Sequence, residues 1–429
     1  MSIRDGGTVA DFRQASPSGN DSRPLKILFC CPVVPYPADS GLKVRVFNLA
    51  LQLARRHRVH FFCLSHGGTD AAALAAIREA GLSITVVEKP PVSLATKVST
   101  YLSRLARGTP LPFILSWEGT IGGELALLAA QGFDAVVAEH LFMARYVTGI
   151  NDQVKLITEH NYEAGLAAQL ASSLPVPLRW LRSAEASWIA AYEKRMLRLF
   201  DGVIAVSESD RQIFVARVPA MPVTLVGNGV DCTRFAGLLE APRPPGLRLL
   251  FLGLLSYQPN EDAVIWFVRE VLPRIVASHP DVVFTIAGAQ PTGRVLALEG
   301  QPGVHVAGPV ADVLDCYRDN ELMVVPLKAG GGSRLKILEA FAAGTPVVST
   351  TKGAEGLDAE DGRHLLIADT PEAFAAAVIR LHEDQDLYLE LRANARRLAE
   401  EKYDWAVQSR VLEAALLAVV RRQKPGGAA

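Results

Sequence analysis

Short apolar runs alternate with helical patterns along most of this chain, and that alternation restricts the fold more than any other feature. The runs at 25–32 (LKILFCCP), 59–66 (VHFFCLSH) and 83–88 (SITVVE) have the length and composition of buried strands, and helical patterns separate them. Continuous apolar strands with helices between them are typical of a parallel sheet that is covered on both faces. We therefore predict an α/β fold.

The pattern occurs twice, which indicates two domains. A chain of 429 residues is too long for a single core of ordinary size. A second series of strands and helices starts with the short run at 223–226, after a break near 216–222. We predict one domain at 24–216 and another at 217–403. Residues 1–23 are polar and rich in glycine and serine, and we expect them to form a flexible tail.

Charge and cysteine content exclude several classes of protein. The formal net charge is −1, so the chain has no general attraction to nucleic acid, and we expect no nucleic-acid partner. No signal peptide is recognisable at the start, and no apolar run reaches the roughly 18 residues of a membrane span. We therefore expect a cytoplasmic protein. No two of the five cysteines have C-x-x-C spacing, so we expect no metal site.

Polar residues follow three predicted strands of the first domain. The pairs Glu139-His140 and Glu159-His160 each come directly after an apolar run, and Ser207 follows a third run. Ligands of open α/β sheets bind outside the carboxyl ends of the strands. These residues are therefore candidates for a ligand-binding edge.

The segment 326–356 (PLKAGGGSRLKILEAFAAGTPVVSTTKGAEG) has the residue types of an anion site. Its glycines let backbone N–H groups approach a ligand, and Ser333 can cap the helix that follows. The start of a helix attracts anions, and Arg334 and Lys336 add full positive charge there. Glu339, further along this helix, can accept hydrogen bonds from both hydroxyls of a ribose. These features predict a bound nucleoside diphosphate.

The stretch KILEAFAAGTPVVSTTKGAEG resembles the donor-binding signature of retaining GT-B glycosyltransferases of glycosyltransferase family 4. Three more segments resemble that family in the same order. They are PYPADSGLKVRVFNLA, VGNGVDCTRF and FLGLLSYQPNEDAVIWF, of which the first resembles the family's glycine loop after the first strand, and we expect a loop at 33–45 and a helix at 46–57 there. SYQPN together with GGGSRLKILEA resembles the exosortase-associated sugar transferases of exopolysaccharide clusters. The resemblance implies a GT-B fold, in which two Rossmann-like domains with parallel sheets face each other across a cleft. It also implies that a C-terminal helix at 404–422 crosses back onto the first domain.

The resemblance assigns roles to individual residues. It places Glu339 on the donor ribose and His140 beside the donor sugar, and it puts Gly331 where the family often has a second glutamate. The family's usual arginine and lysine are missing from the loop around Gly253, so we infer that Arg334 and Lys336 neutralise the diphosphate. We expect catalytic roles for His140, Arg334 and Lys336, and donor contacts for Gly41, Ser207, Gly253, Asn260, Gly331, Gly332, Ser333 and Glu339. We expect acceptor contacts for Lys43, Arg45, Glu159 and His160.

The resulting hypothesis is a retaining, metal-independent glycosyltransferase that needs no cofactor. It would move a sugar from a UDP- or GDP-sugar to a glycan or lipid-linked glycan in exopolysaccharide or cell-surface polysaccharide synthesis. A nucleotide-sugar 2-epimerase and an inactive nucleotide-sugar-binding protein are the alternatives, and Gly331 is the feature that favours the second. The helix at 178–200 carries Trp180 and Trp188 among arginines. It is compatible with peripheral contact at the inner face of the membrane, although such a stripe more often packs on a core.

Overall fold

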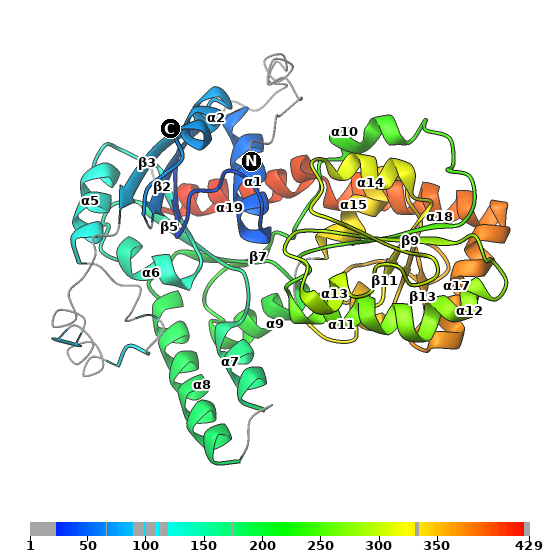
Figure 1. The fold of residues 1–429 in the computed structure, drawn as a ribbon. Helices are drawn as coiled ribbons and strands as arrows, with labels where there is room; N and C mark the ends of the chain where they lie inside the picture. The colour runs from blue at the N-terminus through cyan, green and yellow to red at the C-terminus, as the bar shows by residue number, and fades with distance from the viewer. Residues whose placement is uncertain are drawn as a thin grey trace. The chain divides into compact units, whose positions relative to one another are not determined.

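The structure is a computed structural model that describes residues 23–65, 67–88, 98–99, 108–110, 113, 119–172, 176–330 and 334–423. The described residues form two compact units, which are shown in Figure 1. One unit holds the residues up to Gly227 together with those from Gln408 onward, and the other is Asn228–Val407. The predicted tail lies outside the described residues, apart from its last position.

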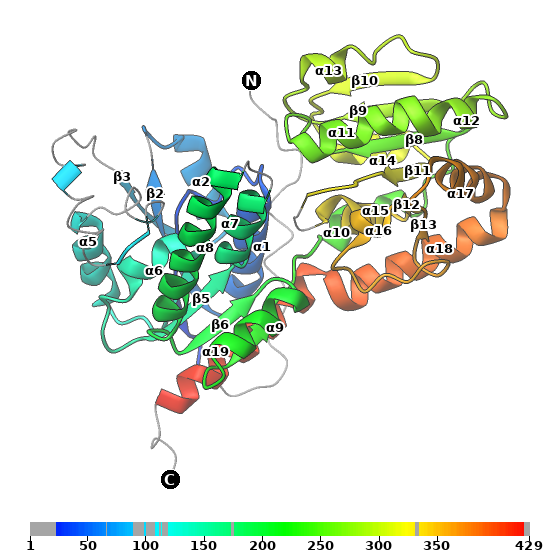
Figure 2. The same cartoon turned by 90° about the horizontal axis from the view of Figure 1, so that it is seen from below.

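The first unit is built on a seven-stranded parallel sheet with the order β3-β2-β1-β4-β5-β6-β7. Its strands are β1 (Lys26–Cys31), β2 (Arg58–Ser65), β3 (Ser83–Glu88), β4 (Ala135–Glu139), β5 (Val154–Glu159), β6 (Gly202–Ala205) and β7 (Val223–Leu225). Its helices are α1 (Gly41–Ala54), α2 (Ala71–Glu79), α5 (Gly119–Ala129), α6 (Leu141–Val147), α7 (Glu163–Ser172), α8 (Val176–Leu197), α9 (Glu208–Arg217) and most of α19 (Trp405–Gln423). Helices α7 and α8 pack against each other as a hairpin (Figures 1 and 2).

Two details of this unit differ from the sequence analysis. Helix α1 begins at Gly41, directly after Ser40, so Gly41, Lys43 and Arg45 lie on the first turns of a helix and not in a glycine loop. The short strand β7 pairs with β6 in the first sheet, so the chain divides after Gly227, later than the stretch 216–222. The apolar run at 223–226 thus completes the first sheet instead of starting the second.

The second unit is built on a six-stranded parallel sheet with the order β10-β9-β8-β11-β12-β13. The strands are β8 (Arg248–Leu252), β9 (Val283–Ala287), β10 (Val304–Gly308), β11 (Leu322–Val325), β12 (Val347–Ser349) and β13 (Leu366–Ile367). The helices are α10 (Cys232–Phe235), α11 (Gln258–Trp266), α12 (Leu272–Val276), α13 (Gly293–Leu296), α14 (Val313–Asp319), α15 (Leu335–Ala343), α16 (Thr351–Ala354), α17 (Pro371–Glu383) and α18 (Gln385–Leu398). Helices α11 and α12 cover one face of the sheet, and α15 and α18 cover the other (Figures 1 and 2).

The apolar patterning explains both cores. The central strands β1, β4 and β11 are buried along almost their whole length, as expected for parallel strands with helices on both faces. The two parallel-sheet domains confirm the predicted α/β fold class. The return of the chain to the first unit is visible in α19, where Glu413 pairs with His57 at 3.0 Å.

Candidate functional site

Helix α15 starts close to the carboxyl end of β11 in the second unit. Its N-cap is Arg334, which has left-handed backbone angles (φ 50°, ψ 26°) and makes no side-chain capping hydrogen bond. The predicted cap, Ser333, lies with Gly331 and Gly332 outside the described residues. At the other end, Gly344 adopts φ 68° and terminates the helix.

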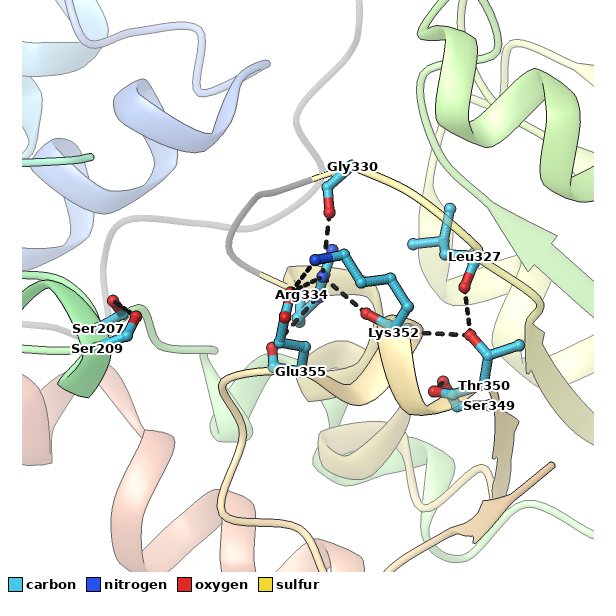
Figure 3. Close-up of polar contacts among 10 residues, drawn as sticks. Ser207, Ser209, Leu327, Gly330, Arg334, Ser349, Thr350, Lys352 and Glu355 are labelled. Atoms are coloured by element: carbon cyan, nitrogen blue, oxygen red, sulfur yellow. Dashed lines mark hydrogen bonds and ion pairs between the residues drawn. The ribbon is translucent and has the colours of Figure 1, made fainter. Parts of the chain in front are cut away.

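Hydrogen bonds from the Arg334 guanidinium link the start of α15 to the segment around α16. It donates hydrogen bonds to the backbone oxygens of Lys352 (2.8 Å), Glu355 (3.3 Å) and Gly330 (3.4 Å), and it pairs with the Glu355 carboxylate at 3.3 Å (Figure 3). The Arg334 residue is only 8% exposed. Arg334 thus carries its positive charge at the predicted position, but backbone carbonyls hold the side chain.

Lys336, in the first turn of α15, meets two other predicted site residues. Its ammonium donates to Asn260 Oδ1 at 3.0 Å and lies 4.1 Å from the centroid of the Phe251 ring. A Cβ atom on Gly253 would lie 2.9 Å from Lys336 Nζ and 3.0 Å from Asn260 Nδ2, so a larger residue would displace the ends of these two side chains. The pKa of Lys336 is lowered to about 7, chiefly by burial and also by the charge of Arg334, while Glu339 opposes both effects. The end of β8, the start of α11 and the start of α15 therefore converge on one desolvated ammonium.

Glu339 lies about one turn further along α15. Its carboxylate accepts a hydrogen bond of 3.4 Å from the Tyr317 hydroxyl, which also lies 3.2 Å from the backbone oxygen of Lys336. Burial raises the pKa of Glu339 to about 7, against the opposing influence of Arg234, Tyr317 and Lys336. Sequence reasoning missed Tyr317, because a tyrosine in a short helix carries no signal of a partner 22 residues away.

In the first unit, the carboxyl ends of β4 and β5 bring two predicted histidines together. His140 Nε2 lies 3.2 Å from Glu163 Oε1, and His160 Nε2 lies 3.0 Å from Glu139 Oε2. The two imidazole rings are stacked with their centroids 6.0 Å apart. Because β4 and β5 are adjacent and parallel, the polar residues that follow each strand meet at one edge of the sheet.

The predicted acceptor residues Arg45 and Glu159 lie inside the first unit. Arg45 is 1% exposed and donates to the backbone oxygens of Val226 and Gly227 at 2.7 and 2.6 Å. Glu159 is 0% exposed, and neither of its carboxylate oxygens has a hydrogen-bond partner among the described residues. Burial raises the pKa of Glu159 well above its ordinary value, and the neighbouring carboxylates raise it further. In this structure neither side chain faces solvent, where an acceptor would bind.

The other predicted residues of this unit are more exposed. Lys43 pairs with Asp39 at 2.9 Å, one helical turn away, and Gly41 is the first residue of α1. Ser207 is the N-cap of α9, where its hydroxyl accepts from the N–H of Asp210 and lies 3.0 Å from the Ser209 hydroxyl (Figure 3). Among the described residues, no three His, Cys, Asp or Glu side chains are arranged to hold a metal ion. No described helix is long and apolar enough to cross a membrane.

Two protein-family models match this chain, one in each half. Residues 40–234 match the model for Glycosyltransferase Family 4, and residues 246–384 match the model for Glycosyl transferases group 1. Together they include the strand ends of the first unit and the start of α15 in the second.

Curated relatives match over part of their length. An uncharacterized 44.6 kDa protein in the cps region of Klebsiella pneumoniae is 29% identical over 164 residues, which are 36% of this chain and 42% of that protein. The GDP-mannose:cellobiosyl-diphosphopolyprenol alpha-mannosyltransferase of Xanthomonas oryzae is 25% identical over 230 residues, 51% of this chain and 58% of that protein. The chain thus spans about half the length of these two relatives.

Solved structures match over nearly the whole chain. A glycosyltransferase from Rickettsia africae has a TM-score of 0.66 at 13% identity and covers 93% of this chain and 100% of its own. Anabaena HepE in complex with UDP has a TM-score of 0.61 at 15% identity, with 92% and 100% covered. At these identities the likeness concerns the fold, and it agrees with the two parallel sheets of the GT-B architecture.

Proposed function

We propose that this chain, which has the GT-B fold and matches a glycosyltransferase model in each half, transfers a sugar from a nucleotide-sugar donor to a glycan or lipid-linked glycan acceptor. The observation that carries the proposal is the arrangement on α15. An ammonium stands in its first turn and a carboxylate about one turn later, on the side where Asn260 and Tyr317 contact them. This order of charges suits a diphosphate followed by a ribose.

In the proposed complex, Lys336 neutralises the diphosphate and Glu339 accepts hydrogen bonds from the ribose hydroxyls. Free N–H groups in the first turn of α15 add to the attraction for the anion. Arg334 contributes positive charge nearby and holds the helix start in place through its carbonyl contacts. The bound HepE structure supports UDP as the nucleotide, and the Xanthomonas relative supports GDP-mannose.

We propose that transfer retains the anomeric configuration. The bond between the anomeric carbon and the diphosphate oxygen breaks while the acceptor oxygen bonds to the same face of that carbon. The acceptor proton passes to the leaving diphosphate oxygen, so no protein nucleophile is needed. Lys336 and the start of α15 stabilise the negative charge that develops on the leaving group. In this scheme the protein supplies that stabilisation itself, and activity should survive chelation of divalent metals.

The relatives point to a place for the reaction. The Klebsiella protein is encoded in a cps region, and the Xanthomonas enzyme acts on a diphosphopolyprenol-linked sugar. We therefore propose that this protein works in the synthesis of exopolysaccharide or another cell-surface polysaccharide. Its acceptor would then be presented at the inner face of the membrane.

A panel of nucleotide sugars tests the proposal. Each candidate is screened by thermal shift, because a ligand that binds only the folded protein raises the melting temperature. The best binder is then incubated with and without lipid-linked glycan acceptors in the presence of EDTA, and the products are analysed by mass spectrometry. Transfer to an acceptor supports the proposal, and conversion of the donor alone to an epimer contradicts it.

A further inference from the structure

His140 has a backbone conformation that the fold must actively maintain. Its φ of 79° is rare for a residue other than glycine and costs on the order of 1–3 kcal/mol. Two backbone hydrogen bonds of 2.9 Å hold it, from its own N–H to the oxygen of Thr158 and from the N–H of Met143 to its oxygen. The imidazole ring also stacks on Phe142, with centroids 4.5 Å apart and planes 7° apart. The position of this ring is therefore set by several independent contacts.

The two ring nitrogens of His140 face different partners. Nδ1 accepts from the backbone N–H of Phe142, so the neutral ring carries its proton on Nε2. That Nε2–H points to Glu163 Oε1 at 3.2 Å. The contact between Nδ1 and Phe142 is long, at 3.4 Å, and leaves the Nδ1 lone pair only weakly satisfied. The side chain of His140 is 13% exposed, which leaves it open to a ligand.

Glu163 is itself held by a buried side chain of another helix. As the first residue of α7, Glu163 donates its backbone N–H to Glu193 Oε1 of α8 at 3.1 Å. Glu193 is 0% exposed, and its Oε2 has no hydrogen-bond partner within the described part of the chain. The sequence carries this acid near the carboxyl end of α8, at a buried position where an apolar residue would pack without loss of hydration. The hydrogen bond that the Glu193 carboxyl accepts from the first N–H of α7 explains why a buried acid is tolerated in α8.

The surrounding charges are mostly acidic. The groups that act on Glu193 are Glu163 from α7 and Asp210 and Arg217 from α9. Glu159, at the end of β5, has its pKa raised by burial and further by Glu193, by these acids and by Glu139. Burial raises the pKa of Glu193 to about 8. Near neutral pH the Glu193 carboxyl is therefore mostly protonated. It can still accept the N–H of Glu163 without adding a second full charge beside it.

We propose that Glu163 and Glu193 are positioning residues that keep His140 in its Nε2–H tautomer, so that Nδ1 is free to accept a hydrogen bond from a sugar hydroxyl. Glu163 does so directly by accepting the Nε2 proton, and Glu193 does so by fixing the first turn of α7. A hydroxyl that approaches Nδ1 replaces the weak contact with the N–H of Phe142. The identity of this hydroxyl as one of the donor sugar or the acceptor rests on the proposed function, whereas the tautomer does not.

Long-range ¹H–¹⁵N NMR of histidine-labelled full-length protein at pH 7 reads the tautomer directly, and the variant His140→Gln assigns the signals. We expect the Nε2–H form in the wild type and in Glu163→Gln, whose amide oxygen still accepts. We expect a mixture of tautomers in Glu163→Leu and a smaller change in the same direction in Glu193→Leu. The control Glu208→Gln, on the exposed side of α9, should leave the spectrum of His140 unchanged. An Nδ1–H tautomer in the wild type, or an unchanged tautomer in Glu163→Leu, overturns the proposal.

Kinetics then separate this proposal from the proposed function. With a nucleotide sugar that turns over, Glu163→Leu should lower kcat about tenfold while the KM for donor changes little, because tenfold corresponds to about 1.4 kcal/mol, the size of a single hydrogen bond. Glu163→Gln should recover most of the rate. If the tautomer behaves as expected but no nucleotide sugar is turned over, the positioning role stands and the transferase proposal fails. If turnover is normal in Glu163→Leu, the positioning role is refuted although the enzyme is a transferase.

Discussion

Replacing Lys336 with methionine should make the protein more stable and abolish donor binding at the same time. Methionine keeps the length of the side chain and its contact with the Phe251 ring, but it removes the ammonium. Burial lowers the pKa of Lys336 from 10.5 to about 7. That fall corresponds to roughly 5 kcal/mol against the charged form, because each tenfold change is worth about 1.4 kcal/mol. Because the side chain keeps some contact with water, we expect Lys336→Met to raise the free energy of unfolding by only about 2 kcal/mol.

The gain in the free energy of unfolding of Lys336→Met should fall as the pH rises. Below pH 7 Lys336 is charged in both the folded and the unfolded protein, so burying the charge lowers the stability of the folded state by its full amount. Between pH 7 and 10.5 the unfolded state binds the extra proton, so the stability of the wild type rises with pH. The advantage of Lys336→Met should therefore be largest at pH 6–7 and should shrink steadily towards pH 10.

Thermal and denaturant unfolding at pH 6.5 and pH 9.5 measure this effect, and the same samples with UDP or GDP added measure nucleotide binding. Lys402→Met, at an exposed lysine of the same domain, is the control and should change stability by at most about 1 kcal/mol at either pH. A gain at pH 6.5 that falls to about a third of its size at pH 9.5, with no thermal shift from nucleotide, fits both roles of Lys336. A loss of stability at pH 6.5 refutes the reasoning about the buried charge, and an unchanged nucleotide shift refutes the diphosphate assignment.

Three further variants test other parts of the structure. Glu339→Gln should weaken nucleotide binding about tenfold in titration calorimetry, because a neutral amide replaces a charge-assisted acceptor; equal affinity would remove the ribose role. Glu159→Gln should flatten the pH dependence of the unfolding free energy of the first domain. In the wild type the folded state keeps a proton that the unfolded state releases above pH 4.5, so this residue lowers stability by about 1.4 kcal/mol per pH unit as the pH rises. Parallel curves for the two proteins would contradict this. Gly288→Ala should cost at least roughly 3 kcal/mol, because its Cβ would lie 1.7 Å from the oxygen of Gly253 at φ 148°. Gly293→Ala, with no atom within 4 Å, is its control in the same melting experiment.

Periodicity predicts the fold well because the two parallel sheets are buried on both faces. Apolar runs such as 133–138 and 322–326 leave little choice other than strands, and turn and capping residues mark several of the helix ends. The start of α1 was predicted five residues late, because the polar letters of GLKVR resemble a loop, whereas Arg45 in fact turns inward to the carbonyls of Val226 and Gly227. Such a contact joins residues more than 180 positions apart, and nothing local in the sequence indicates it.

The candidate site was predictable only in part, for the same reason. Spacing along one helix relates Lys336 to Glu339, and strand ends relate His140 to His160. The contacts of Lys336 with Asn260 and Gly253 are tertiary and could be inferred from the family resemblance alone. The carboxyl of Glu193 gave no signal, because a glutamate within a polar helix pattern is normally on the wet face.

The opposite pKa shifts of Lys336 and Glu339 have a common consequence for ligand binding. Burial pushes the pKa of the lysine down and that of the glutamate up, both to about 7, so near neutral pH each group is only partly charged in the free protein. A diphosphate next to Lys336 favours the ammonium and draws a proton in, while ribose hydroxyls next to Glu339 favour the carboxylate and let one go. The two exchanges nearly cancel, so a nucleoside diphosphate can charge both groups with little net transfer of protons to solvent. Inorganic phosphate has no ribose and would charge only the lysine. If the proposed function holds, the pair favours a ligand that carries both a diphosphate and a ribose, and binding of such a ligand offsets the cost of keeping two partly buried ionisable groups in the empty domain.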